Sequence, residues 1–310
     1  MSDYSTLKDF LVYGKKNFPA ERYLLSIGNH GGGWKGACFD HTNSDGFLTM
    51  DEFQKALDEV GGVDIICFTP CSMGALESAY ELRNCTDIYI GNEAGGDYSF
   101  WRFMTGDLCT LLNENPDISN VDLGKNIIRL MKKNFIDIFL QEYPGVSREM
   151  RIQCFKWFRV LISTNAVDTS NMEQIGKSVD QLARDLSLEI PNKSFRIKMI
   201  RILTQSFYPK FFKLYDEDII CDKIDILDFA KKCHTFFFFD KEIRSDAREL
   251  MNNINNAVIA TFHSIYLPQA RSLTIYFPSK INVYNSSYTT VDLDFVKDTY
   301  WDEFLGLYLN

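Results

Sequence analysis

Two short segments carry a histidine and a cysteine in settings suited to nucleophilic catalysis. His30 follows the apolar run 23–27, and Cys71 follows the apolar run 63–68. Both runs are typical of buried strands, and open α/β folds place their sites at the carboxyl ends of parallel strands. A nearby histidine lowers the pKa of a thiol, and the thiolate is the form that attacks a carbonyl. We therefore predict acyl-transfer chemistry at a shared sheet edge.

The backbone around the two residues fits the same chemistry. Three glycines follow His30, and glycine allows a tight turn and a close approach to a ligand. Acyl transfer needs backbone N–H groups aimed at the developing oxyanion, for which we predict the amides of Gly31 and Cys71. The order, histidine first and cysteine later, is that of caspase-like enzymes. The competing interpretation is a loop histidine and a cysteine buried as a small apolar side chain.

The elements around these segments alternate between strand and helix. Thr49 and Glu52 form a capping box that begins a helix, and Gly61 and Gly62 end it. We predict helices at 6–17, 49–60 and 72–83 and strands at 23–27, 63–68 and 88–90, with a polar loop between His30 and Thr49. This order predicts an α/β fold with a doubly wound, mostly parallel sheet and helices on both faces.

The remainder of the chain is mainly helical. We predict helices at 101–145 and 170–256, the second broken near Pro191 and Pro209, and a final helix at 293–308. Further strands are expected at 160–162 and 273–277. We expect one domain over residues 1–310, with a catalytic βα core at 1–100, a mainly helical insertion at 101–256, and a C-terminal strand and helix at 257–310.

Composition excludes several classes of function. The net charge of −9 argues against a nucleic-acid-binding surface. The 8 cysteines lack the paired spacing of zinc sites or disulfide scaffolds, and only 4 histidines occur. No apolar run reaches the roughly 18 residues of a membrane span, and the first residues do not resemble a signal peptide. We expect a soluble chain without nucleic-acid or membrane partners, of undetermined oligomeric state.

The chemistry-bearing segments resemble the clostripain family of caspase-like (clan CD) cysteine peptidases. That family carries a His-Gly-x-Gly-Trp strand end, an Asp-x-Cys-x-Met-Gly strand end and a Glu-x-Ala-Tyr helix. This chain has matching residues at 30–34, 71–74 and 77–80, and further similarity at 18–20, 272–278 and 298–305. The resemblance implies a caspase-like fold and a cysteine endopeptidase acting on peptide or protein substrates. It also implies His30 as base or proton shuttle, Cys71 as nucleophile, a thioester acyl-enzyme, and cleavage after basic residues.

Two departures from the family pattern concern specificity and maturation. The acidic residue two positions before the cysteine, which resembles a specificity-pocket anion, is Thr69 here. Its loss removes a charge-assisted partner for arginine or lysine. Glu93 or Asp97 could replace that anion, but ordinary loop polarity is the favoured interpretation. Family members are often matured by cleavage after a basic residue between histidine and cysteine, and residues 36–54 contain none. We predict altered specificity or no self-processing.

A third departure is length. Only 22 residues precede the first strand, whereas the family usually has an earlier strand with its helix, so we expect an N-terminally shortened copy. A missing strand would leave a sheet edge open. The chain alone indicates a cytoplasmic protein, and a lost N-terminal segment would allow secretion. These departures favour one alternative, a catalytically inactive or truncated clostripain-like binding module. Amidase or transpeptidase chemistry on the same residues is another.

Residues 41–52 partly match a calcium-binding loop. Asn43, Asp45 and Glu52 occupy ligand positions three, five and twelve, but His41 stands where aspartate is usual. No convincing helix leads into this stretch. We expect no cofactor beyond a weak calcium site at these residues.

Overall fold

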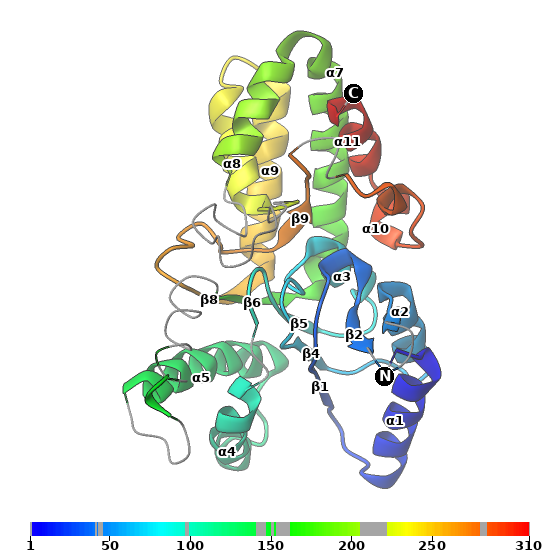
Figure 1. Ribbon diagram of the computed structural model, residues 1–310, viewed down its shortest axis with the longest axis vertical. Coiled ribbons are helices and arrows are strands. Elements are labelled where there is room, and N and C mark those ends of the chain that lie inside the picture. Colours follow the sequence, from blue (N-terminus) through cyan, green and yellow to red (C-terminus); the bar gives the residue numbers. More distant parts are fainter. Residues whose placement is uncertain are drawn as a thin grey trace.

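A five-stranded sheet forms the centre of the molecule (Figure 1). The computed structural model describes residues 2–40, 42, 46–96, 99–140, 147–149, 152, 162–204, 222–279 and 284–309. The strand order is β1 (Leu24–Ile27), β4 (Ile65–Phe68), β5 (Ile88–Asn92), β6 (Ser163–Asp168) and β8 (Val258–His263). The first three strands are parallel, and β6 is antiparallel to both of its neighbours. Four strands therefore share one direction, which confirms the mostly parallel sheet.

Helices cover both faces of this sheet, as the sequence predicts. Along β4, Ile66 and Phe68 point into one core and Ile65 and Cys67 into the other. Period-two alternation with apolar residues on both sides is the pattern of a strand buried on both faces. The first face packs against α1 (Tyr4–Asn17), α2 (Met50–Asp58), α3 (Leu76–Glu81) and α7 (Met172–Leu203), and the second against α4 (Ser99–Glu114) and α5 (Asn120–Leu140).

The connection between the first two strands differs from the predicted polar loop. It contains an antiparallel hairpin of β2 (Ala37–Asp40) and β3 (Gly46–Leu48), preceded by the 3-10 turn η1 (Gly33–Lys35). The next helix, α3, begins at Leu76 rather than at residue 72. Ser72 has a φ of +62°, and the Gly74 N–H donates to the Asn92 carbonyl at 2.7 Å. This tertiary contact holds residues 72–75 outside the helix.

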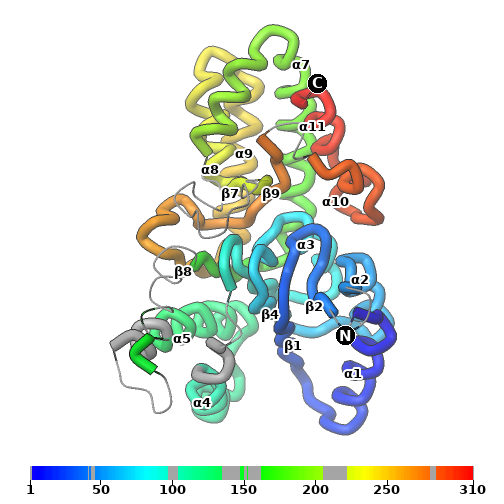
Figure 2. The backbone as a smooth tube through the Cα atoms, viewed as in Figure 1, coloured from blue at the N-terminus to red at the C-terminus, as the bar shows by residue number. Residues whose placement is uncertain are grey.

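A helical layer lies beyond one end of the sheet and contains α7, α8 (Ile226–Phe236) and α9 (Lys241–Ala257) (Figures 1 and 2). The break predicted near Pro191 is confirmed by a kink at Lys193, whose φ of −133° and ψ of 25° are not helical; Pro209 lies outside the described residues. Two strands, β7 (Lys223–Asp225) and β9 (Thr274–Tyr276), pair antiparallel between this layer and the sheet. The predicted final helix is two helices, α10 (Asp294–Asp298) and α11 (Trp301–Leu309), separated by extended backbone at Thr299. Two further 3-10 turns are η2 (Thr169–Asn171) and η4 (Ser286–Thr289).

The expected division into parts at 1–100, 101–256 and 257–310 does not follow the boundaries of the central sheet. The stretch 101–256 contributes β6 to the interior of the sheet, and β8 from the C-terminal part forms its edge. The predicted strand at 160–162 begins instead at Ser163, residues 160 and 161 lying outside the described part. The strand predicted at 273–277 is β9, which joins β7 rather than the central sheet. Across the described residues, no helix has the length and apolarity required to cross a bilayer.

Candidate active site

The register of two neighbouring strands places His30 and Cys71 at one edge of the sheet. β1 and β4 are parallel, with Ile27 paired to Phe68, so each of the two residues lies three positions beyond that pair. Both strands end there because Gly28 and Pro70 interrupt the apolar runs. His30 is exposed, and Cys71 is half-buried. A thiol and an imidazole at adjacent strand ends are positioned for nucleophilic chemistry.

The two loops pack backbone against backbone. A Cβ atom added to Gly31 would lie 2.5 Å from the Cys71 carbonyl oxygen and 2.7 Å from Met73 Cγ. One added to Gly33, whose φ is +66°, would lie 3.1 Å from the Ser72 carbonyl oxygen. The glycine run after the histidine therefore allows the approach of the cysteine loop, since any side chain would occupy that space.

The hairpin after His30 fixes the glycine loop without using the Gly31 amide. Cys38 N–H donates to the His30 carbonyl at 3.1 Å, and Gly32 N–H donates to the Gly36 carbonyl at 2.8 Å. Gly31 faces Ala37 as the pair between these two bonds. Within the described part of the chain, neither the Gly31 N–H nor the Cys71 N–H donates a hydrogen bond. Two unused amides beside a thiol have the character of an oxyanion hole.

Residues at the end of β5 hold the cysteine loop from its other side. The Gly96 N–H donates to Cys71 Sγ at 3.3 Å. The buried Asn92 amide donates to the carbonyls of Phe68, Thr69 and Pro70 at 3.3, 3.0 and 3.2 Å. Sequence reasoning considered this segment only for its carboxylates and missed Asn92 and Gly96. The sequence signal that could have indicated these two residues was a polar, glycine-rich segment directly after the strand next to β4.

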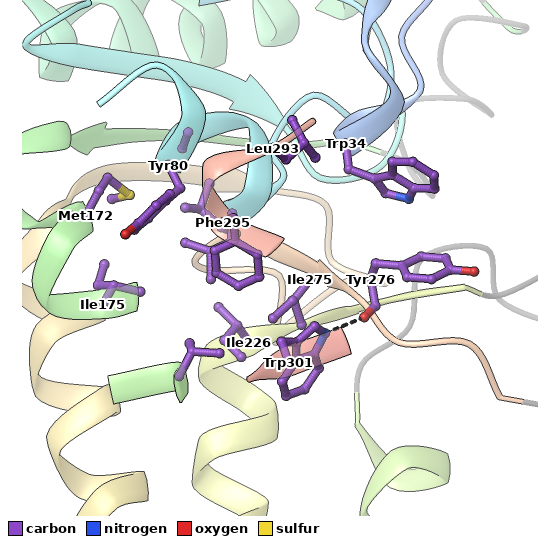
Figure 3. Close-up of a cluster of buried hydrophobic side chains, with 14 of the residues drawn as sticks. Trp34, Tyr80, Met172, Ile175, Ile226, Ile275, Tyr276, Leu293, Phe295 and Trp301 are labelled. Carbon is purple, nitrogen blue, oxygen red and sulfur yellow. Dashed lines mark hydrogen bonds between the residues drawn. The ribbon is translucent and has the colours of Figure 1, made fainter. Parts of the chain in front are cut away.

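Aromatic packing anchors the glycine loop to β9. The Trp34 ring meets Tyr276 edge to face with a centroid separation of 5.6 Å (Figure 3). It meets Tyr288 edge to face at 5.1 Å. Trp301 Nε1 donates to the Tyr276 carbonyl at 2.8 Å, as Figure 3 shows. Glu77 Oε1 accepts from the Tyr276 N–H at 2.8 Å and the Tyr288 hydroxyl at 3.1 Å. Burial raises the pKa of Glu77 to about 7. The Trp, Glu and Tyr positions thus form a support beneath the loop.

Comparison with known proteins decides the family. The sequence pattern of the clostripain family matches residues 1–308. The chain belongs to the clostripain family. It is 24% identical to clostripain of Hathewaya histolytica over 94% of this chain, and it spans about 60% of that relative's length.

Solved structures place the fold in the same group. A secreted C11 cysteine protease of Bacteroides thetaiotaomicron, bound to an irreversible peptide inhibitor, has a TM-score of 0.62 and 16% identity. The match covers 97% of this chain and 78% of that one. An inactive zymogen C11 protease of Parabacteroides distasonis has a TM-score of 0.64 and 16% identity, covering 96% and 76%. These similarities confirm the caspase-like fold.

Two of the three residues considered for the specificity pocket of this clostripain-family chain are buried. Thr69 is buried, and its hydroxyl donates to the Ile27 carbonyl at 3.1 Å. Glu93 is fully buried, accepts from the Ser163 hydroxyl at 2.9 Å, and also accepts from the Asn165 amide. Burial and the neighbouring Asp225 carboxyl raise the pKa of Glu93 well above its usual range. This shift favours the neutral form of Glu93 and a structural role. Asp97 lies outside the described residues.

The calcium-loop expectation falls mostly outside the described residues, because Asn43 and Asp45 are among those not described. Glu52 belongs to the predicted capping box at the start of α2: its Oε2 accepts from the Thr49 N–H at 3.0 Å and the Thr49 hydroxyl at 3.1 Å. Among the residues that the structure describes, no three His, Cys, Asp or Glu side chains are grouped to hold a metal ion.

Proposed function

We propose that this chain is a cysteine endopeptidase that hydrolyses peptide bonds through His30 and Cys71. The observation that carries the proposal is the packing of Gly31 against the Cys71 backbone, with both amides unused by the described residues. A pair of N–H donors beside a half-buried thiol suits the tetrahedral intermediates of acyl transfer. Membership of the clostripain family supports the same reaction class.

The reaction divides into two acyl transfers. His30 takes the proton of the Cys71 thiol, and the Sγ thiolate attacks the peptide carbonyl carbon. The carbonyl oxygen becomes an oxyanion facing the Gly31 and Cys71 amides. The C–N bond then breaks, the leaving amine takes a proton from His30, and a thioester remains. His30 next removes a proton from water, and the resulting hydroxide attacks the thioester. Release of the carboxylic acid product returns the thiol.

Basic-residue specificity is expected to be weak. Thr69 stands where the family pattern has aspartate, and its hydroxyl donates to the Ile27 carbonyl. Burial and Asp225 raise the pKa of Glu93, which favours its neutral form. An arginine or lysine side chain would therefore meet no carboxylate at either position. The variant Thr69→Asp should raise kcat/KM for arginine and lysine peptides relative to leucine peptides. An unchanged ratio would contradict the assignment of Thr69 to the specificity pocket.

The experiment that tests the function is covalent labelling with acyloxymethyl-ketone peptide probes carrying Arg, Lys, Asn, Asp or Leu beside the reactive group. Wild type should be labelled, and Cys71→Ala should not. The exposed Cys109 is a matched control, because Cys109→Ala should keep the labelling. No labelling of a folded wild-type protein by any probe would overturn the peptidase and favour the inactive binding module.

A further inference from the structure

A lysine from a distant part of the chain reaches the glycine loop of the active site. Lys223 is the first residue of β7 and pairs with Tyr276 of β9. A Cβ atom added to Gly33 would lie 3.4 Å from both Lys223 Cε and Lys223 Nζ. The same point lies 3.1 Å from the carbonyl oxygen of Ser72, the residue after Cys71. The ammonium group and the nucleophile loop therefore contact the same short piece of backbone.

Among the described residues, no anion pairs directly with this ammonium group, although the charges of Asp222 and Glu77 stabilise it. In the part of the chain that the structure describes, Lys223 Nζ makes no hydrogen bond and no ion pair. Burial lowers the pKa of Lys223, and the charges of Asp222, Glu77 and Cys71 partly oppose that effect. Glu77 itself is engaged by the Tyr276 N–H and the Tyr288 hydroxyl. Lys223 is half-buried, and a cation that has lost part of its hydration is stabilised when another group supplies the opposite charge.

The other charged groups around the site do not neutralise Lys223. Lys35 lies near enough to add like charge, lowering the pKa of Lys223 further. Burial and Asp225 raise the pKa of Glu93, which favours its neutral form, and Thr69 carries no charge. Lys223 and Lys35 place positive charge beside the glycine loop, with Asp222 and Glu77 as the described charges that oppose it. A lysine in this position favours an anionic substrate group over a cationic one.

We propose that Lys223 is a specificity-determining residue that receives a carboxylate of the substrate beside the scissile bond. The inference rests on the proposed peptidase function and names its substrate class. The carboxylate belongs either to an acidic side chain or to the free C-terminus of a short peptide. In both cases a charge-assisted hydrogen bond to the ammonium replaces the water lost on binding.

The test compares glutamate with glutamine, which differ in charge but hardly in shape. The peptides have acetylated N-termini and amidated C-termini. In each pair, one of the two residues flanking the scissile bond is Glu in one peptide and Gln in the other. In wild type, kcat/KM for one Glu peptide should exceed that of its Gln partner at least tenfold. Lys223→Met should lower this ratio toward one, Lys223→Arg should retain it, and Lys231→Met, at an exposed position on α8, should leave it unchanged. A second arm compares the free-acid and amidated forms of the Gln peptides and identifies the source of the carboxylate.

The outcomes separate this inference from the function on which it rests. If wild type cleaves no peptide in a Cys71-dependent manner, the peptidase itself is overturned. If it cleaves Glu and Gln peptides equally well, and also free-acid and amidated peptides equally well, only the role of Lys223 is overturned. Equal slowing of all peptides in Lys223→Met, with the ratios intact, would show that the lysine serves the thiol or the fold, and would also overturn it. The wild-type ratios remain decisive even if Lys223→Met fails to fold.

Discussion

Replacing Gly31 with alanine tests whether close packing of the two loops is required for catalysis. The added Cβ would lie 2.5 Å from the Cys71 carbonyl oxygen and 2.7 Å from Met73 Cγ, whereas ordinary contact begins at 3.4 Å. The loops must therefore separate by about 1 Å, a displacement that typically costs on the order of 100-fold when reacting groups are involved. Loss of one oxyanion donor alone costs about 100- to 1000-fold. We expect kcat/KM of Gly31→Ala to fall about 100- to 1000-fold.

Gly32→Ala is the matched control in the same loop. Its φ of −119° suits any residue, and its nearest neighbour would be Lys35 Cβ at 3.3 Å, the first atom of a side chain at the loop surface. We expect this variant to stay within about threefold of wild type, since it needs only a few tenths of an ångström of adjustment. Steady-state kinetics on the preferred peptide would be measured beside circular dichroism and thermal unfolding.

One result would refute the reasoning about the loops. If Gly31→Ala is folded and keeps kcat/KM within about threefold of wild type, like the Gly32→Ala control, the proximity of Gly31 to Cys71 has no catalytic role. An equal loss in both variants would instead point to general sensitivity of the loop. A loss confined to Gly31→Ala, with circular dichroism unchanged, would support the paired amides.

Two further predictions concern the buried groups behind the cysteine loop. Asn92→Ala removes an amide that donates to three carbonyls and should lower the free energy of unfolding by about 2–3 kcal/mol. Asn115→Ala, at an exposed position, should cost less than about 0.5 kcal/mol, and equal costs in urea denaturation would contradict the role of Asn92. Glu93 has a native pKa raised by burial and by Asp225, so the native state keeps a proton that the unfolded chain releases above about pH 4.3. Stability should therefore fall as pH rises through this window, by up to about 1.4 kcal/mol per pH unit. Glu93→Gln should flatten this dependence and be more stable than wild type at alkaline pH; parallel urea-denaturation profiles from pH 5 to 8 would exclude the effect.

Local patterns determined much of the fold and the candidate site. The capping box at Thr49 and Glu52 and the glycines 61 and 62, both with positive φ, signalled the limits of α2. Apolar runs of three to six residues identified β1, β4 and β5, and their alternation with helices predicted parallel pairing. His30 and Cys71 could be chosen because each follows such a run. These features depend on neighbours a few positions away, which the sequence shows directly.

The pairing of strands distant in the sequence depended on the tertiary structure. Residues 258–263 are rich in β-branched and aromatic residues, which favour a strand, but they directly follow a long helix and the sequence does not show which strand they join. They pair with β6 as the edge strand β8. The more obvious apolar run at 273–277 pairs with β7 instead. Nothing local distinguishes a strand of the main sheet from a strand of a small one, since both show the same alternation.

The charges around the site also depended on the tertiary structure. In sequence, Glu93 is a loop carboxylate near the cysteine segment and Lys223 is an ordinary lysine far from it. Folding buries Glu93 beside Ser163, Asn165 and Asp225, which favours its neutral form. It brings Lys223 onto the glycine loop instead. Residue types and spacing thus indicated a candidate nucleophile and base, whereas the charges around them depended on desolvation and on partners that only the folded chain brings together.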